Sequence, residues 1–224
     1  GFGLFYAPLS MASIYGESWF VAATWQITIL AGLLLTPLFG QKIPGKQFGM
    51  TLLILLGIVL IQIPYFGRGL GEGVVRASIL ILIAAFSYPL GNRKMLAHCK
   101  GEQLSTTQRV FGMTLMSVPF WLLLSVFAGL DAGLPSGGQM LQSLIVAVFS
   151  GVIATMLFFE ATNLVKHNHQ QLAVVEATQA GEVLFTLFGG CLFLGDQIPT
   201  PLGFLGVFIV IVGIVGNSLL TSLD

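Results

Sequence analysis

Long apolar stretches separated by short polar segments dominate this sequence and restrict it to one class of fold. A helix needs about 20 apolar residues to cross a hydrocarbon layer about 30 Å thick. Eight stretches reach or approach that length: 1–15, 19–39, 48–65, 74–96, 110–130, 144–165, 172–194 and 202–220. Their apolar residues do not alternate as in strands, and an open sheet would leave its edge amides unpaired in lipid. We therefore predict an all-α, polytopic membrane protein.

The scarcity of charge supports this prediction. Only 8% of the 224 residues are charged, against about 25% in a soluble domain. Nine basic residues balance nine acidic ones, so no net field favours nucleic acid as a partner. The two cysteines, Cys99 and Cys191, lack metal or redox spacing and are best interpreted as small apolar side chains. The composition predicts a lipid bilayer as the main partner, with no metal and no cofactor.

The basic residues are unevenly distributed between the two sets of connecting segments. Seven of the nine lie in or beside the segments that follow the second, fourth and sixth stretches: Lys42, Lys46, Arg93, Lys94, Lys100, Arg109 and Lys166. The opposite segments carry Glu17, Asp131 and Asp196, and a mixed group of Arg68, Glu72 and Arg76. Basic segments stay in the cytoplasm. We therefore predict a multi-pass protein of the cytoplasmic (plasma) membrane with a cytoplasmic C-terminus.

The sequence also contains an internal repeat. GQKIP at Gly40 recurs as GDQIP at Gly195, and other matches at offsets of 153 to 156 residues keep the same order. An odd number of predicted helices separates equivalent positions, so the two copies face opposite sides of the membrane, a common arrangement in secondary transporters. We predict that 1–66 is the C-terminal part of the first repeat, 67–73 a connector and 74–224 the second repeat.

Three motifs resemble one known family of transporters. They are GLFYAPLS at Gly3, TTQRVFGMTLMSVPFW at Thr106 and VEATQAGEV at Val175. With the repeat, they are similar to the drug/metabolite transporter superfamily (EamA-like), in its branch of multidrug-resistance efflux transporters. The resemblance implies ten helices in two inverted five-helix repeats, of which about eight are present. By that comparison the first two helices and the start of the third are missing.

Glu182 is the sharpest candidate for function. It is the eleventh residue of the stretch 172–194, which predicts a position near the bilayer midplane. A carboxylate there costs about 2.5–3.5 kcal/mol, and such residues usually mark ion or substrate paths. Thr178, Gln179 and Thr186 share its helical face. We predict that Glu182, with Thr178 and Gln179, binds a proton and substrate; the alternative is structural hydrogen bonding between helices by a protonated carboxyl.

The repeat predicts which residues face Glu182. An offset of 154 carries Thr178, Gln179 and Glu182 onto Thr24, Trp25 and Thr28. Trp and carboxylate groups both attract cations. A site with Glu182 on one side and Trp25 on the other therefore favours a cationic or amphipathic aromatic compound. The alternative for Trp25 and Thr28 is ordinary helix packing.

Five further residues are weaker candidates. Glu160 and Glu176 lie near the cytoplasmic ends of their stretches and could form an inner vestibule or pair with Arg109, which could also anchor its helix at the interface. Pro89 and Pro119 lie within predicted helices, where proline permits a bend. They are candidate gating hinges or simple kinks.

These features favour a secondary transporter that exports small compounds by proton-coupled alternating access. A homo-oligomer is compatible with the sequence. One alternative is an exporter of amino acids or other metabolites without proton coupling. Another is a membrane scaffold that transports nothing. Motifs of hydrolases, zinc proteases and redox enzymes are absent from the sequence, so we do not expect an enzyme.

Overall fold

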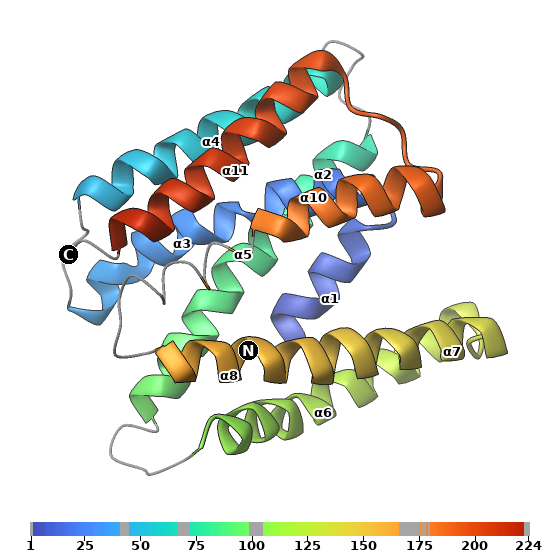
Figure 1. Cartoon of the computed structure of the whole chain (residues 1–224). Helices are drawn as coiled ribbons and strands as arrows, with labels where there is room; N and C mark the ends of the chain where they lie inside the picture. Colours follow the sequence, from blue (N-terminus) through green and yellow to red (C-terminus); the bar gives the residue numbers. More distant parts are fainter. Residues whose placement is uncertain are drawn as a thin grey trace.

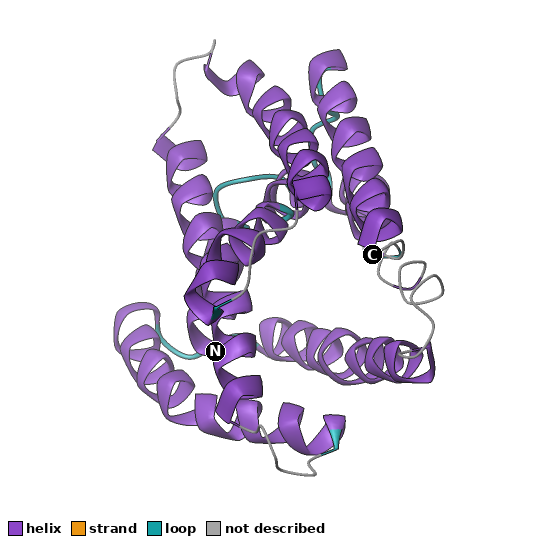
Figure 2. Cartoon of the chain, turned by 90° about the vertical axis from the view of Figure 1, so that its left-hand side faces the viewer, coloured by secondary structure: helices purple, strands orange, loops and turns teal. Residues whose placement is uncertain are grey.

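The computed structural model describes residues 2–40, 45–66, 72–98, 105–165, 175, 178 and 180–221. Every regular element within these residues is a helix, and none of them forms a strand. Figure 2 shows that helices make up nearly all of the described chain. The predicted all-α fold is therefore confirmed.

The helix bounds agree with most of the predicted stretches. The elements are α1 (Phe2–Ala12), α2 (Ser18–Trp25), α3 (Ile27–Leu35), η1 (Thr36–Phe39), α4 (Gly45–Phe66), α5 (Glu72–His98), α6 (Thr106–Ala132), α7 (Gly137–Val146), η2 (Ala147–Ala154), α8 (Thr155–Val165), α10 (Ala180–Gly189), η3 (Gly190–Leu194) and α11 (Pro201–Thr221). The elements η2 and η3 are wider π-helical turns that continue α7 and α10.

Five helical segments are long and apolar enough to cross a membrane: Ser18–Phe39, Glu72–Met95, Thr107–Ala132, Gly137–Phe158 and Pro201–Leu220. The other apolar helices among the described residues are shorter: Phe2–Ala12, Phe48–Pro64 and Ala180–Leu194. Among the described residues, these eight segments match the eight predicted stretches in order. This arrangement is that of a polytopic membrane protein, as predicted.

The helices pack in two groups that meet at α1 and α5 (Figure 1). In the first group, α4 lies along α11, α10 packs on α2, and α3 packs against both α4 and α5. In the second, α6 contacts α1, and α7 to α8 runs beside it in the figure. The buried core belongs to the first group and includes Phe20, Ile54, Ile81, Val183 and Val210.

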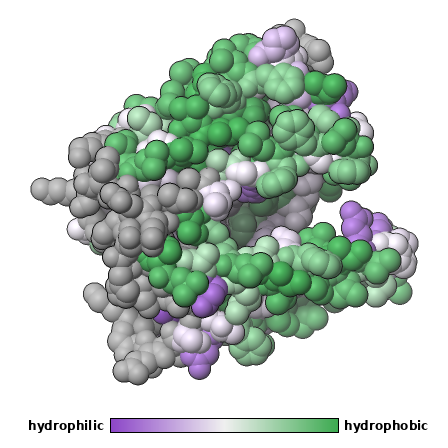
Figure 3. All heavy atoms as spheres, viewed as in Figure 1, coloured by the Kyte–Doolittle hydropathy of each residue, from purple (hydrophilic) through white to green (hydrophobic). Residues whose placement is uncertain are grey.

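The outer surface is apolar. Every residue from 131 to 154 is exposed, and most of them are apolar. Figure 3 shows hydrophobic side chains over both groups of helices and a hollow between the groups. So much exposed apolar surface is unfavourable in water. We therefore interpret it as the surface that contacts lipid.

The closest helix pair, α4 and α11, is antiparallel and depends on glycine. A Cβ added at Gly57 would lie 2.7 Å from the Gly206 carbonyl oxygen, and one at Gly206 would lie 2.6 Å from the Gly57 carbonyl oxygen. Farther along, Gly213 meets Ile54, where an added Cβ would lie 2.5 Å from its side chain. Small residues let two membrane helices approach to backbone contact, so these glycines set the distance between α4 and α11.

The two repeated turns begin with the same backbone conformation. Gly40 ends η1 with φ 74° and ψ 15°, and Gly195 ends η3 with φ 74° and ψ 22°. Both lie in the left-handed region that only glycine adopts without strain, and such a residue commonly ends a helix. The remainder of the first turn, 41–44, lies outside the described residues.

The second of these turns is fastened to the start of α2. The Ser18 backbone N–H donates to Asp196 Oδ2 at 2.7 Å, and Trp19 Nε1 donates to the Gln197 carbonyl oxygen at 3.0 Å. The N-cap residue of α2, Glu17, does not cap the helix with its side chain. Asp196, distant by 178 residues from Ser18, therefore supplies the acceptor that a local cap usually provides.

We expect Asp196→Ala to lower the free energy of unfolding by about 1 kcal/mol, the usual cost of losing a helix cap. Asp196→Asn keeps an acceptor oxygen and should cost less. The measurement is thermal unfolding of the purified protein in detergent, followed by intrinsic fluorescence. Equal melting temperatures for wild type and Asp196→Ala would show that the bond does not stabilise α2.

Candidate functional site

Two of the predicted helices are interrupted, although 19–39 and 172–194 were expected to be continuous. At Gln26, the backbone bonds Gln26 N–H to Ala23 O (3.3 Å) and Ile29 N–H to Gln26 O (3.1 Å) replace the α-helical pattern. At Thr178, the bonds Thr178 N–H to Val175 O (3.2 Å) and Gly181 N–H to Thr178 O (2.9 Å) have the same spacing. Tighter bonds of this kind often mark a hinge or a functional site in a helix.

Glu182 lies directly after the second interruption. It stands in the first turn of α10 rather than in the middle of a long continuous helix, because α10 begins at Ala180. The residue is exposed. The partial positive charge of a helix N-terminus favours a carboxylate at this position.

Gln26 is the partner that the sequence reasoning missed. Its side chain is 2% exposed, donates from Nε2 to the Ala22 carbonyl oxygen at 3.2 Å, and interacts with the Glu182 carboxyl. The contact follows from the packing of α10 on α2. The repeat contained the signal: an offset of 156, within the observed range, carries Glu182 onto Gln26, whereas the offset of 154 led to Thr28.

The residues predicted to face Glu182 have other contacts. Thr24 is buried and accepts a hydrogen bond from Gln62 Nε2 at 3.4 Å, and Thr28 Oγ1 donates to the Ala85 carbonyl oxygen at 3.1 Å. Gln62 Nε2 also reaches Ser78 Oγ at 3.5 Å. Thr24 and Thr28 therefore join α2 and α3 to α4 and α5, in a polar chain beside Gln26.

Trp25 belongs to a cluster of aromatic rings. Its ring centroid lies 4.9 Å from that of Phe5 and 5.8 Å from that of Tyr88, and Tyr6 lies 4.2 Å from Phe5. Such distances are typical of attractive aromatic pairs. The cluster joins α1, α2 and α5, next to the interruption at Gln26.

The other members of the predicted polar stripe are only partly described. Thr178 Oγ1 donates to the Val175 carbonyl oxygen at 2.6 Å, and Thr186 Oγ1 donates to the Glu182 carbonyl oxygen at 2.8 Å. Both hydroxyls thus bond to their own helical segment. Gln179 and Glu176 lie outside the described residues.

The remaining candidates are spread over the second group of helices. Glu160 is exposed on α8, and Arg109 is half-buried in the first turn of α6. Pro89 lies inside α5 and Pro119 inside α6, as expected of residues that bend helices. Their part in gating stays a prediction, as do the roles of Glu160 and Arg109.

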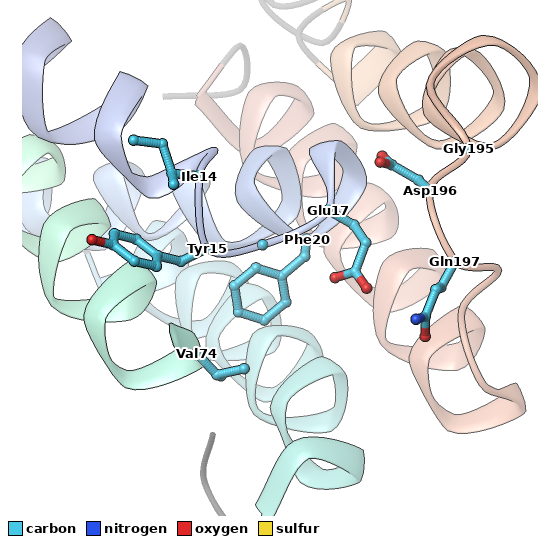
Figure 4. Close-up of a pocket in the computed structure, with 9 residues that line it drawn as sticks. Ile14, Tyr15, Glu17, Phe20, Val74, Gly195, Asp196 and Gln197 are labelled. Atoms are coloured by element: carbon cyan, nitrogen blue, oxygen red, sulfur yellow. The ribbon is translucent and has the colours of Figure 1, made fainter. Parts of the chain in front are cut away.

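A cavity of about 380 Å³ lies beside the turn at Gly195 (Figure 4). Glu17 and Gln197 extend into the same space, and Phe20 covers one wall. It lies at the same end of the helices as the Asp196 bond to Ser18. A second cavity of about 780 Å³ lies between α1, α6 and the α7–α8 helix, and its lining includes Tyr6, Trp121 and several hydroxyl groups.

One family of membrane transporters matches nearly the whole of this sequence. A family profile described as "EmrE: Putative multidrug resistance efflux transporter" matches residues 1–223. The chain belongs to this family. The predicted resemblance is therefore confirmed, and the family is one of transporters. The match does not bear out the separate expectation that two helices precede Gly1.

Two bacterial proteins are similar to this member of the efflux transporter family over most of its sequence. "Uncharacterized protein YjlA" of Bacillus subtilis (strain 168) is 49% identical over 226 aligned residues, covering 95% of this chain and 69% of the relative. "Uncharacterized 42.1 kDa protein in intracellular alkaline protease 3'region" of Shouchella clausii is 41% identical, covering 81% of this chain and 50% of the relative. The chain thus spans half to two thirds of the length of these relatives. No solved structure matches it significantly.

Proposed function

We propose that this chain is a secondary transporter that exports small cationic or amphipathic compounds by proton-coupled alternating access. Glu182 binds a proton and a cationic substrate in turn, so that import of one drives export of the other. The family membership supports transport as the activity. The substrate class and the coupling to protons rest on the chemistry of the site.

The observation that carries this proposal is the pair of interrupted helices joined by Glu182 and Gln26. Secondary transporters bind substrates where discontinuous helices from two repeats meet near the bilayer midplane. Here a carboxyl from one interrupted helix contacts a buried amide from the other. Intramembrane carboxyls are costly and usually functional, and a proton or cation neutralises this one.

The inverted repeat is part of the proposal, with 1–66 and 74–224 as its two copies and 67–73 as the connector. The similar backbone angles of Gly40 and Gly195 support it. So does the antiparallel packing of α4 on α11, because equivalent helices of inverted repeats run in opposite directions across the membrane. Alternating access then consists of rocking one copy against the other about Glu182.

The surroundings favour an aromatic or amphipathic cation. The rings of Phe5, Trp25 and Tyr88 lie close to the interruption at Gln26, and aromatic faces attract cations. Tyr6 extends this cluster into the wall of the cavity of about 780 Å³. That volume is within the range of sites for drug-sized ligands.

The charges support an orientation with the C-terminus in the cytoplasm. Lys94, His98 and Arg109 lie at one end of α5 and α6, where those helices are joined. Asp131 lies at the opposite end, and Arg76 there is neutralised by Glu72 at 2.5 Å. Basic ends stay inside, and we place the protein in the plasma membrane.

The test is transport by the purified full chain in proteoliposomes. A pH gradient should drive a fluorescent cationic dye across the membrane, and dissipating the gradient with an ionophore should stop it. Counterflow of amino acids or other metabolites without any pH dependence would favour the uncoupled exporter instead. Absence of flux together with a stable co-purifying partner would favour the scaffold.

Gln26→Leu provides a test of the pairing itself. Leucine has a similar volume but no hydrogen-bonding groups, so Glu182 loses its partner. We expect weaker dye binding and slower transport. Added to Glu182→Gln, Gln26→Leu should weaken dye binding no further, since the two residues act together. Independent, additive losses in the dye dissociation constant would contradict the pairing.

A further inference from the structure

A third cavity lies at the end of the molecule where α5 and α6 are joined. Its volume is about 630 Å³, and α1, α5 and α6 form its walls. Lys94, His98 and Arg109 stand around it, together with Gln108. Among the described residues that line it, none is acidic. It is separate from the pair of Glu182 and Gln26, which lies between α10 and α2.

The rim of the cavity is basic and its wall farther along α6 is apolar. The basic groups lie at one rim, close to the ends of two membrane-spanning segments, since those segments are Glu72–Met95 and Thr107–Ala132. Positions farther along α6 are apolar, including Met113, Met116 and Phe120. The rim therefore lies at the level of the lipid headgroups, and the apolar wall extends into the hydrocarbon layer.

The start of α6 strengthens the positive potential at the rim. Ser105 and Gln108 form a reciprocal capping box, with Ser105 Oγ accepting from the Gln108 N–H at 3.2 Å and Gln108 Oε1 accepting from the Ser105 N–H at 2.8 Å. This fixes the positive end of a 27-residue helix beside Arg109. Helix N-termini attract anions such as phosphate.

A ligand that fits both halves has an anionic head and an apolar tail, and the membrane supplies one. We propose that this cavity binds an anionic phospholipid, with its phosphate against Lys94 and Arg109 and an acyl chain along Met113, Met116 and Phe120. Basic pockets between membrane helices on the cytoplasmic side bind such headgroups. Binding itself does not depend on the proposed transport; the proposed orientation decides only which leaflet supplies the lipid.

The test is native mass spectrometry of the purified full chain in detergent, with equal amounts of phosphatidylglycerol and phosphatidylcholine of identical acyl chains. We expect preferential retention of phosphatidylglycerol. Lys94→Gln and Arg109→Gln should each lower its binding constant about fivefold, the effect of one basic residue near a lipid headgroup. Lys94→Arg should retain the lipid, which shows that a loss in Lys94→Gln is due to charge and not to misfolding.

Arg76→Gln is the matched control. Arg76 is an exposed basic residue at the opposite end of the same helix, in an ion pair with Glu72, so its removal should leave phosphatidylglycerol retention unchanged. Equal retention of both lipids, or an equal loss in Arg76→Gln, would overturn the proposal. Inorganic phosphate distinguishes a lipid site from a simple anion site: displacement of phosphatidylglycerol by phosphate would also overturn it, and Met113→Asn should weaken lipid retention.

Discussion

Replacement of Glu182 by Gln should abolish dye transport driven by a pH gradient, down to the level of liposomes without protein. The change keeps the size of the side chain and a hydrogen-bonding group for Gln26, but it removes the group that gains and loses a proton. Because the amide has no charge, it neither couples to the gradient nor attracts a cation. Initial rates of dye flux, with and without the gradient, measure the effect.

Glu160→Gln is the control for this variant. Glu160 is an exposed carboxyl on α8, so its removal tests whether any carboxyl in an apolar helix would give the same result. We expect the Glu160 variant to keep gradient-driven transport. If Glu182→Gln still drove pH-dependent efflux, Glu182 would not be the coupling group.

Gly206→Ala should cause the largest loss of stability among single conservative changes. The added methyl group would meet the Gly57 carbonyl oxygen at 2.6 Å and the Ile61 backbone nitrogen at 2.9 Å. Backbone atoms cannot rotate away as a side chain can, so α4 and α11 must separate. We expect a loss of about 1–3 kcal/mol, typical of overpacking, measured as a lower melting temperature in detergent.

Gly49→Ala is the matched control, because it makes the same chemical change within α4. A Cβ there would meet nothing within 4 Å, and alanine favours a helix over glycine by about 1 kcal/mol. The variant should be as stable as the wild type or more so. Equal destabilisation by Gly49→Ala and Gly206→Ala would show that the contact between α4 and α11 is not the cause.

The apolar stretches were sufficient to predict an all-helical membrane protein, because lipid leaves few other ways to satisfy the backbone. The repeated sequence at Gly40 and Gly195 corresponds to two helix ends that depend on glycine. The interruptions at Gln26 and Thr178 were not predicted. Both segments contain only residues compatible with a helix, and hydropathy does not distinguish a continuous helix from one with a tight turn.

The candidate site was harder to predict than the fold, since contact between repeats depends on register. An error of two residues in the offset turns a helix by about 200°. The offset of 154 led to Thr28, which bonds to Ala85, whereas the offset of 156 leads to Gln26, which interacts with Glu182. The residue types alone predict a carboxyl that faces polar and aromatic groups of the first predicted repeat, and this stays a prediction.

The bond between Asp196 and Ser18 has a consequence for the order in which the protein is made. Ribosomes synthesise α2 long before the turn at Gly195, so the first amide of α2 has no Asp196 to pair with while the intervening helices enter the bilayer. The same delay applies to α4, because the helix that packs on its glycines, α11, is synthesised last. Helices α2 and α4 therefore complete their packing only after the turn at Gly195 and α11 have been synthesised. Asp196 thus forms its bond to α2 late in biosynthesis, when the helical assembly is completed.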